Sequence, residues 1–580
     1  MGNCFPSPCN FACPSTINNP TAPSDQAVAI RFRFLVHHCP NHPDVLLHYL
    51  RIFPPTRIVR NDCCPRCQQN WCNPFATILN QMESDLENAS IQRDSLISLQ
   101  DLASRNYQDD IGREGIRTIL AAMEHHLTIA DVQQHGLEVL GSLAVHNHNN
   151  QVIIAQRRGI NAIVSAMEEL QNNATVQENG CAVILKLAVN DQNIMDMAAT
   201  TNVINQVFSA MEKQSNNVTV QENGCAALVE LAVNYKISEL IGTPRGIKVI
   251  LNAMNQNQNF LVQRNGCAAL WKLAVNDEIR RNIASEPKSI DAIVTAMEKH
   301  KDKATVQENG CAALWNLAVD ETISRQIADK SIEHILLAME SHLDKATVQH
   351  YGCAALWKLA VDDDIRQAIS TQRGIDNILS ALKTHSFNAN VLDKGCQALW
   401  NLASKESIRQ AIVGTECIDV ILAVMKTNSS NADVQHYGCR TLVRLAANKD
   451  ENLLKKKIAE AGGISTILSA MMEHLKMVNV QHFGCAALQI LACEEKTRED
   501  IGAKGIATIL SAMETHSGVI DVQLYGFGAL CTLAKCANNK NEMKKRAMQA
   551  ISIAKNNHSG NVDVKEKYEA LQNLLRSWLG

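Results

Sequence analysis

The stretch ATVQENGCAALWNLAVD, residues 304–320, decides how this chain folds. Five small or apolar residues fall along it at i, i+4, i+7, i+8 and i+11: Val306, Gly310, Ala313, Leu314 and Leu317. That spacing predicts one amphipathic helix over 304–320, with an apolar stripe on one face and polar residues on the other. A single helix cannot bury such a stripe, whereas stacked copies of it can.

Near-copies of this stretch recur along the chain: TVQENGCAVILKLAVN from Thr175, TVQENGCAALVELAVN from Thr219 and TVQHYGCAALWKLAVD from Thr347. With the position of Gly310 as a marker, twelve units follow one another at intervals of 41 to 46 residues. The markers are Ser95, Gly136, Gly180, Gly224, Gly266, Gly310, Gly352, Gly395, Gly438, Gly484, Gly526 and Tyr568. This period predicts a solenoid over residues 76–580, and the replaced glycine in both terminal units is typical of capping repeats.

Each unit contains two shorter helical patterns before the motif, such as 277–284 and 289–300. The second pattern often begins at a Gly-Ile pair: Gly115-Ile116, Gly159-Ile160, Gly246-Ile247, Gly374-Ile375, Gly463-Ile464 and Gly505-Ile506. Glycine fits the sharp turn that ends a helix. The sequence therefore predicts an all-α fold of about twelve three-helix repeats.

Charge and cysteine content narrow the class of protein. With 55 basic and 59 acidic residues the net charge is −4, which argues against a general nucleic-acid binder. No apolar run is long enough to span a membrane. Eight of the 20 cysteines occupy one repeat position, where we expect small, buried, unpaired thiols: Cys181, Cys225, Cys267, Cys311, Cys353, Cys396, Cys439 and Cys485. Reduced thiols indicate the cytosol or the nucleus.

Residues 1–75 form a different segment, rich in proline and cysteine and without the repeat pattern. It begins MGNCFPSPCNFAC, so Gly2 is a candidate for N-myristoylation and Cys4 for palmitoylation. Two acyl chains give stable membrane anchoring where one gives only marginal binding. The myristoylation motif prefers Ser or Thr at the position of Pro6, and the alternative is a flexible tail.

The same segment contains two ligand-x-x-ligand turns, Cys39-Pro-Asn-His42 and Cys64-Pro-Arg-Cys67. Four such side chains match the tetrahedral coordination of a structural zinc ion. A zinc knuckle is thus one expectation for this segment, and an unliganded chain is the other.

A unit of about 42 residues with a short helix, a GI-x-x-I-L-x-A-M helix and a V-Q-x-x-G-C-A-A-L-x-N-L-A helix resembles the armadillo repeat. HEAT repeats usually have two helices and lack the Gly-Ile start. The motif is also similar to the armadillo arrays of leucine-rich-repeat kinases, although this chain has neither leucine-rich repeats nor a kinase signature. More loosely, the N-terminus resembles that of the acylated vacuolar armadillo scaffold of fungi. The resemblance implies a right-handed superhelix whose third helices line a concave groove for extended peptides.

Import receptors of this fold grip basic signals with a ladder of tryptophans and, four residues later, asparagines. Here Asn316 occupies the asparagine position, but Ala312 occupies the tryptophan position. The same asparagine position holds Lys272, Lys358, Asn401 and Arg444 in other repeats. An import-receptor-like adaptor is therefore the alternative function, and most of its ladder is absent.

Three registers of the third helix are candidates for binding a partner. Four successive repeats carry tryptophan in one register, either as packing between helices or as the wall of a groove: Trp271, Trp315, Trp357 and Trp400. The residue before the marker changes from amide to aromatic along the chain: Asn223, Asn265, Asn309, then Tyr351 and Tyr437. Amides there suit a peptide backbone and aromatics suit its side chains. Lys272, Lys358 and Arg444 suit a partner with acidic residues.

No nucleophile elbow, phosphate loop, zinc-protease helix or kinase signature is present. The sequence thus predicts a non-catalytic scaffold that binds protein segments, without a cofactor apart from the candidate zinc. A ubiquitin-ligase adaptor with an N-terminal zinc site is a further alternative. We expect a cytoplasmic or nuclear protein, held at a membrane if Gly2 and Cys4 are acylated.

Overall fold

The computed structural model describes residues 74–577 apart from 200–201, 319–320, 372, 414, 448–452 and 559. Within these residues every regular element is helical, which confirms the predicted all-α fold. The candidate lipidation residues Gly2 and Cys4 and the candidate zinc ligands Cys39, His42, Cys64 and Cys67 lie outside the described residues. No described helix has the length and apolar character needed to cross a bilayer.

The chain divides into two compact units with the boundary between Asn193 and Ile194, and each is described by itself. The helices of the first unit are α3 (Pro74–Ser84), α4 (Ala89–Leu102), η2 (Ala103–Tyr107), α5 (Gln108–His125), α6 (Ala130–Ala144), α7 (His148–Gln156), α8 (Gly159–Glu169) and α9 (Ala174–Leu187). The boundary falls within α10 (Asp191–Ala199). In this unit α4, α6 and α9 carry the repeated motif and pack in succession.

In the second unit the third helix of each repeat packs against the third helix of the next. These helices are α12 (Val218–Leu231), α15 (Phe260–Leu273), α18 (Ala304–Leu317), α20 (Ala346–Leu359), α23 (Ala389–Leu402), α26 (Ala432–Ala446), α29 (Val478–Leu491) and α31 (Ile520–Leu533). The final repeat is formed by η3 (Ala537–Asn539), α32 (Lys540–Asn557) and α33 (Val562–Ser577).

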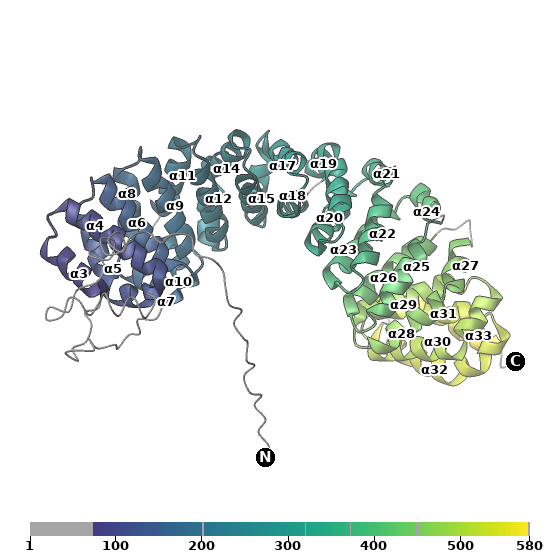
Figure 1. The fold of residues 1–580 in the computed structure, drawn as a ribbon. Helices are drawn as coiled ribbons and strands as arrows, with labels where there is room; N and C mark the ends of the chain where they lie inside the picture. Colours follow the sequence, from purple (N-terminus) through teal and green to yellow (C-terminus); the bar gives the residue numbers. More distant parts are fainter. Residues whose placement is uncertain are drawn as a thin grey trace, which may run out of the picture. The chain divides into compact units, whose positions relative to one another are not determined.

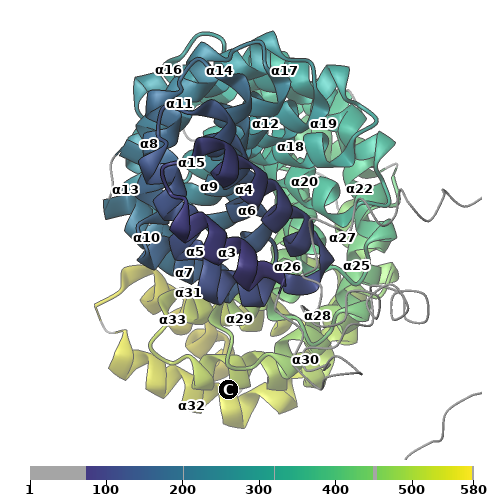
Figure 2. The ribbon, with the colours of Figure 1, turned by 60° about the vertical axis from the view of Figure 1, so that its left-hand side comes forward.

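The first and second helices of these repeats form a separate row. The second helices are α11 (Asn202–Lys213), α14 (Pro244–Gln256), α17 (Ser289–Lys299), α22 (Gly374–Thr384), α25 (Cys417–Thr427) and α28 (Gly463–Glu473). The first helices are α13 (Tyr235–Ile241), α16 (Asp277–Ser285), α21 (Asp363–Thr371), α24 (Glu406–Val413) and α27 (Leu453–Glu460). In Figures 1 and 2, α14 and α17 lie on one side of α12, α15 and α18, so the second helices leave the other side of these third helices uncovered.

The predicted stripe is the core of each repeat. Val306, Ala313, Leu314 and Leu317 are fully buried, as are their counterparts along the chain. Gly310 is required by close approach, because a Cβ there would lie 2.6 Å from Cγ and 2.7 Å from Sδ of Met297 on α17. The same glycine–methionine contact recurs in most repeats, so this pair fixes how closely the second and third helices pack.

A buried glutamine, which the motif analysis did not single out, ties the third helix to the second. Gln307 is 2 % exposed, and its Nε2 donates to the carbonyl oxygens of Met297 at 2.8 Å and His300 at 2.9 Å. Both carbonyls lie at the end of α17, where a helix lacks internal partners. The glutamine therefore caps the second helix from the side, and Gln133, Gln177, Gln349 and Gln481 repeat the arrangement.

The predicted end of the motif helix is wrong. The helix α18 ends at Leu317 rather than at residue 320. In the neighbouring repeats the polar residue at the end of the motif is the N-cap of the next first helix: Asn234 and Asn276 accept from backbone N–H groups of α13 and α16. The last residues of the motif thus form the corner between two helices.

The Gly-Ile pairs mark the predicted helix start in α8, α22 and α28. Helix α14 begins two residues before its pair, at Pro244, and α30 (Glu495–Thr515) continues through Gly505 after a break at Gly502. Helix α22 begins at Gly374, and the preceding Arg373 has the left-handed backbone conformation, with φ of 64°. The residue after Arg373 has to be glycine, because a Cβ on Gly374 would lie only 2.6 Å from the carbonyl oxygen of Ile369. At Gly115 no turn forms, and α5 runs through it, so the predicted break is wrong there.

Histidines at the ends of second helices join successive loops. His342 Nε2 donates to the carbonyl oxygen of Lys301 at 2.8 Å, and His385 repeats this contact with Leu343 at 2.7 Å. The buried cysteine column is also structural. Burial raises the pKa of one member, Cys311, to about 12, so this thiol is neutral and unreactive.

Candidate functional site

The predicted binding residues lie along one side of the third helices of the second unit. We call the solvent-facing side of α12, α15, α18, α20, α23, α26, α29 and α31 the third-helix face. All four tryptophans on it are half-buried. Each of them contacts a side chain of a later third helix, and each is still partly accessible to solvent.

The asparagines of this face join neighbouring repeats. Asn309 Nδ2 donates to the carbonyl oxygen of Arg264 at 3.1 Å, and Asn316 Nδ2 donates to that of Trp271 at 3.1 Å. Asn265 and Asn401 make the same bond to the preceding third helix, with Glu222 at 3.2 Å and Trp357 at 2.8 Å. One amide hydrogen of each thus fixes the spacing between helices.

On α12, Asn223 occupies the register of Asn265 and Asn309, directly before the marker glycine, and is half-buried. The idea that these amides bind a peptide backbone stays a prediction.

Three aromatic rings from successive third helices form an aromatic cluster: Trp271, Trp315 and Tyr351. The ring centroids of Trp271 and Tyr351 are 5.2 Å apart in an edge-to-face arrangement, and those of Trp315 and Tyr351 are 5.9 Å apart. The Trp315 indole N–H is buried and has no hydrogen-bond acceptor among the described residues. No described cation lies over these rings, although Lys272 is adjacent to Trp271 in sequence.

Farther along the face, cations cover the tryptophan rings. The ammonium groups of Lys358 and Lys394 each lie 5.0 Å from the ring centre of Trp357. The guanidinium groups of Arg440 and Arg444 lie 3.5 Å and 5.1 Å from that of Trp400. Because Lys394 and the two arginines come from the next repeat, these cation–π contacts link adjacent third helices.

On α26 and α29, histidines stack on aromatic rings of the next repeat. His436 stacks on Phe483 with centroids 5.2 Å apart, and His482 stacks on Tyr525 at 5.0 Å. Tyr437 lies beside His436, with centroids 4.3 Å apart. Burial lowers the pKa of both histidines, so both imidazoles are neutral at pH 7.

Charged groups near these histidines add smaller effects. Arg440 lowers the pKa of both, while Asp433 and Asp393 raise that of His436 and Asp521 raises that of His482. Sequence analysis missed these histidines and Arg440. The signal was the recurrence of histidine directly before the aromatic residue in QHY and QHF.

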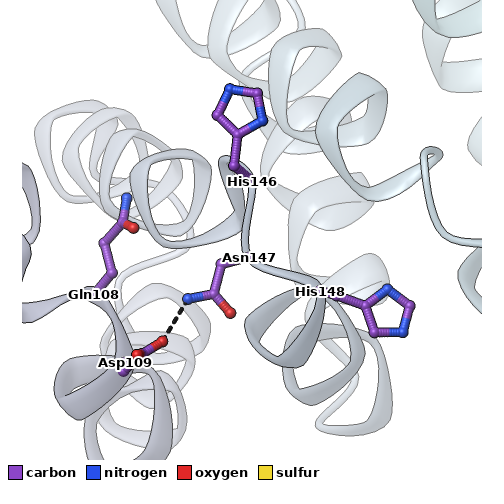
Figure 3. Close-up of a pocket in the computed structure, with 5 residues that line it drawn as sticks. All are labelled: Gln108, Asp109, His146, Asn147 and His148. Atoms are coloured by element: carbon purple, nitrogen blue, oxygen red, sulfur yellow. Dashed lines mark hydrogen bonds between the residues drawn. The ribbon is translucent and has the colours of Figure 1, made fainter. Parts of the chain in front are cut away.

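A polar pocket of about 490 Å³ lies in the first unit, lined by Gln108, Asp109, His146, Asn147 and His148. Figure 3 shows that His146 and His148 point away from each other, while Asn147 Nδ2 donates to Asp109 Oδ1 at 2.7 Å. Asn190 Nδ2 also donates to His148 Nδ1 at 3.0 Å. Asp109, Asn147 and His148 therefore each have a hydrogen-bond partner within the protein, and no group of the described residues has the geometry of a metal site.

Comparisons with known proteins agree with this architecture. The family described as LRRK2 ARM repeat matches residues 69–330 and 192–564. None of the curated proteins compared with the chain matches it. Among solved structures, an engineered protein is 19% identical with a TM-score of 0.63, covering 72% of this chain and 99% of its own.

A second solved structure is a beta-catenin from a study of a phosphorylation switch in cadherin binding. It is 13% identical with a TM-score of 0.65, covering 87% of this chain and 99% of its own. At these identities the two structures show the fold alone. The family match extends over most of the chain, and it agrees with the repeat, the three-helix unit and the stacked third helices. The chain therefore belongs to the family of LRRK2-type armadillo repeats.

Proposed function

We propose that this chain is a non-catalytic scaffold that binds a segment of a partner protein along the third-helix face. The observation that carries the proposal is the unbroken run of aromatic and cationic side chains from α15 to α31. Tryptophan, tyrosine and arginine dominate the binding energy of protein interfaces. Here they are concentrated on the side of the repeats that the second helices leave uncovered.

An extended segment fits this face better than a globular partner surface does. The groups that face solvent recur once per repeat, so a chain that crosses the third helices meets one set after another. Main-chain groups of such a segment can bind amides, and its side chains can contact the rings between them. The interaction partner named for beta-catenin in that study, a cadherin, is a protein.

The alternative of an import receptor has less support. Its tryptophan position is Ala312 in α18 and Ala354 in α20, and both alanines are fully buried. The tryptophans of this chain stand three residues later, where cations of the same chain cover two of them. A basic import signal would meet Lys358, Arg440 and Arg444, which repel it.

Site-specific photo-crosslinking tests the proposal. A photoreactive amino acid at Lys358, which is exposed on α20, should crosslink to a partner in cells. The matched control is Leu337 on α19 (Glu321–Ser341), which is 42 % exposed on the second-helix side. Crosslinks to a defined protein segment from position 358 and not from 337 are expected. Equal crosslinking from both positions, or from 337 alone, would overturn the proposal.

A further inference from the structure

The third-helix face carries an excess of positive charge at one place. Arg366 and Arg409 on the adjacent first helices each pair with a carboxylate, Asp363 at 2.7 Å and Glu406 respectively. The guanidinium groups of Arg440 and Arg444 on α26 lie over aromatic rings, and no carboxylate among the described residues pairs with either of them. Two guanidinium groups thus lie half-buried without a counter-ion.

This arrangement is unfavourable in the free protein. Burial lowers the pKa of Arg444, and the nearby charges of Arg409 and Arg366 lower it further. Burial also lowers the pKa of Arg440, with Arg444 adding to the effect. Partly desolvated like charges destabilise a fold unless an anion compensates them. Trp400 holds both guanidinium groups in position through its ring, so the anion need not organise them.

The part of the face formed by α15, α18 and α20 has a different chemistry. In the aromatic cluster of Trp271, Trp315 and Tyr351 no described cation covers the rings. At the intermediate position Lys394 is already paired with Asp393 at 3.1 Å. The face therefore offers an apolar anchor site at α15, α18 and α20 and an anion site at α23 and α26.

We propose that the partner segment has two anchors, an acidic or phosphorylated side chain bound by Arg440 and Arg444 and an aromatic or large apolar side chain bound at the aromatic cluster. This inference rests on the proposed function and specifies the segment that the face selects. The anionic oxygen atoms accept hydrogen bonds from the guanidinium groups, which present a planar set of donors suited to carboxylate or phosphate. The apolar side chain covers the exposed parts of the three rings.

The repeats set the distance between the two anchors. Tyr351 is on α20 and Arg440 is on α26, two third-helix steps away with α23 between them. Packed helices lie about 8–10 Å apart, so two steps span about 16–20 Å. An extended chain advances about 3.3 Å per residue, so about five or six residues separate the anchors.

Peptide selection on the full-length protein tests this inference. A phage library of random peptides of about fourteen residues covers the required span. We expect enrichment of acidic residues about five or six positions from an aromatic residue. Synthetic peptides with glutamate, phosphoserine or serine at the acidic position separate the carboxylate from the phosphate as the preferred anion.

Two variants assign the anchors. Arg440→Gln combined with Arg444→Gln should weaken binding of the acidic peptide about tenfold or more and leave the serine peptide unchanged. Trp315→Ala should weaken binding of peptides with the aromatic residue about tenfold and leave the preference for the acid. Because the arginines are uncompensated, the double variant should melt no lower than the wild-type protein, so lost binding would not reflect unfolding.

The outcomes separate this inference from the proposed function. If selected peptides bind the third-helix face without preference for acid, or with an acid preference that survives the arginine double variant, the two-anchor inference is wrong and the scaffold function stands. If no peptide binds and position 358 gives no crosslink, both fail.

Discussion

The glutamine cap between the second and third helices leads to a quantitative prediction. In a Gln307→Leu variant the Met297 carbonyl loses the donor that lies at 2.8 Å, and it stays buried. A buried carbonyl without a partner costs about 1–3 kcal/mol. The His300 carbonyl keeps a second donor, the backbone N–H of Lys303 at 2.9 Å, and so loses less. Leucine regains about 1 kcal/mol through its buried apolar surface, which leaves a net loss of about 2 kcal/mol.

Hydrogen exchange read by mass spectrometry resolves this local effect, whereas global unfolding of a solenoid need not be two-state. A loss of about 2 kcal/mol should speed exchange at the end of α17 roughly thirtyfold. Gln326→Leu, at an exposed position on α19, is the control and should leave exchange at the end of α17 unchanged. Unaltered exchange in the Gln307→Leu variant would show that the glutamine only fills space.

The chain contains a natural counterpart of this variant. Leu392 of α23 occupies the glutamine position and is fully buried, so it has no amide to donate to the end of α22. We therefore expect the end of α22 to exchange faster than that of α17 in the wild-type protein. Leu392→Gln should increase protection there, because the carbonyl oxygens of Leu382 and His385 would gain a donor.

Three further predictions follow from the structure. Gly310→Ala should destabilise the packing of α17 on α18 by about 1–3 kcal/mol, read as faster hydrogen exchange in both helices. Combination with Met297→Ala should cost less than the sum of both changes, because the added methyl group fills the space that the methionine leaves. Arg373→Gly should raise thermal stability slightly, by up to about 1 kcal/mol, because φ of 64° strains every residue except glycine; a lower melting temperature would contradict this. Burial holds the pKa of His436 and His482 below the ordinary 6.5, so the unfolded chain binds more protons at these residues than the folded chain does. Hydrogen-exchange protection of α26, α29 and α31 should therefore fall as the pH drops from about 7 to about 5. The fall should be smaller in a His436→Gln variant.

The fold was readable from the sequence because the buried residues repeat. Val306, Gly310 and Leu317 recur at one register, and helical spacing alone places them on one face. The end of the helix was not readable in this way, because Ala318 continues the apolar pattern although the chain turns there. Gln307 was missed since periodicity separates polar from apolar positions and does not show that a polar side chain caps a buried helix end.

The candidate site was predictable only in part. Spacing put Trp357, Trp400 and Arg444 forward as candidates, and in the structure Lys358 lies over Trp357 and Arg444 lies over Trp400. Whether these residues bind a partner stays a prediction. Which cation covers which ring depends on the offset between successive repeats, and no single helix encodes that offset. Arg440 is an example, because it reaches Trp400 from the next repeat and lies in a register that holds alanine in most other repeats.

The architecture explains how one repeat can carry an unfavourable pair of charges. In a solenoid, stability is approximately the sum of the repeats and of the interfaces between neighbours. The apolar stripe and the glutamine cap of α26 are intact, with Val434, Leu442 and Leu445 buried and Gln435 Nε2 donating to Met425 and Asn428. These interactions lie on the opposite side of the helix from the face and do not depend on its chemistry. The surface residues of a single repeat can therefore change to suit a ligand while the core residues of that repeat are preserved. An anion that compensates the two arginines of α26 would stabilise that repeat as it binds.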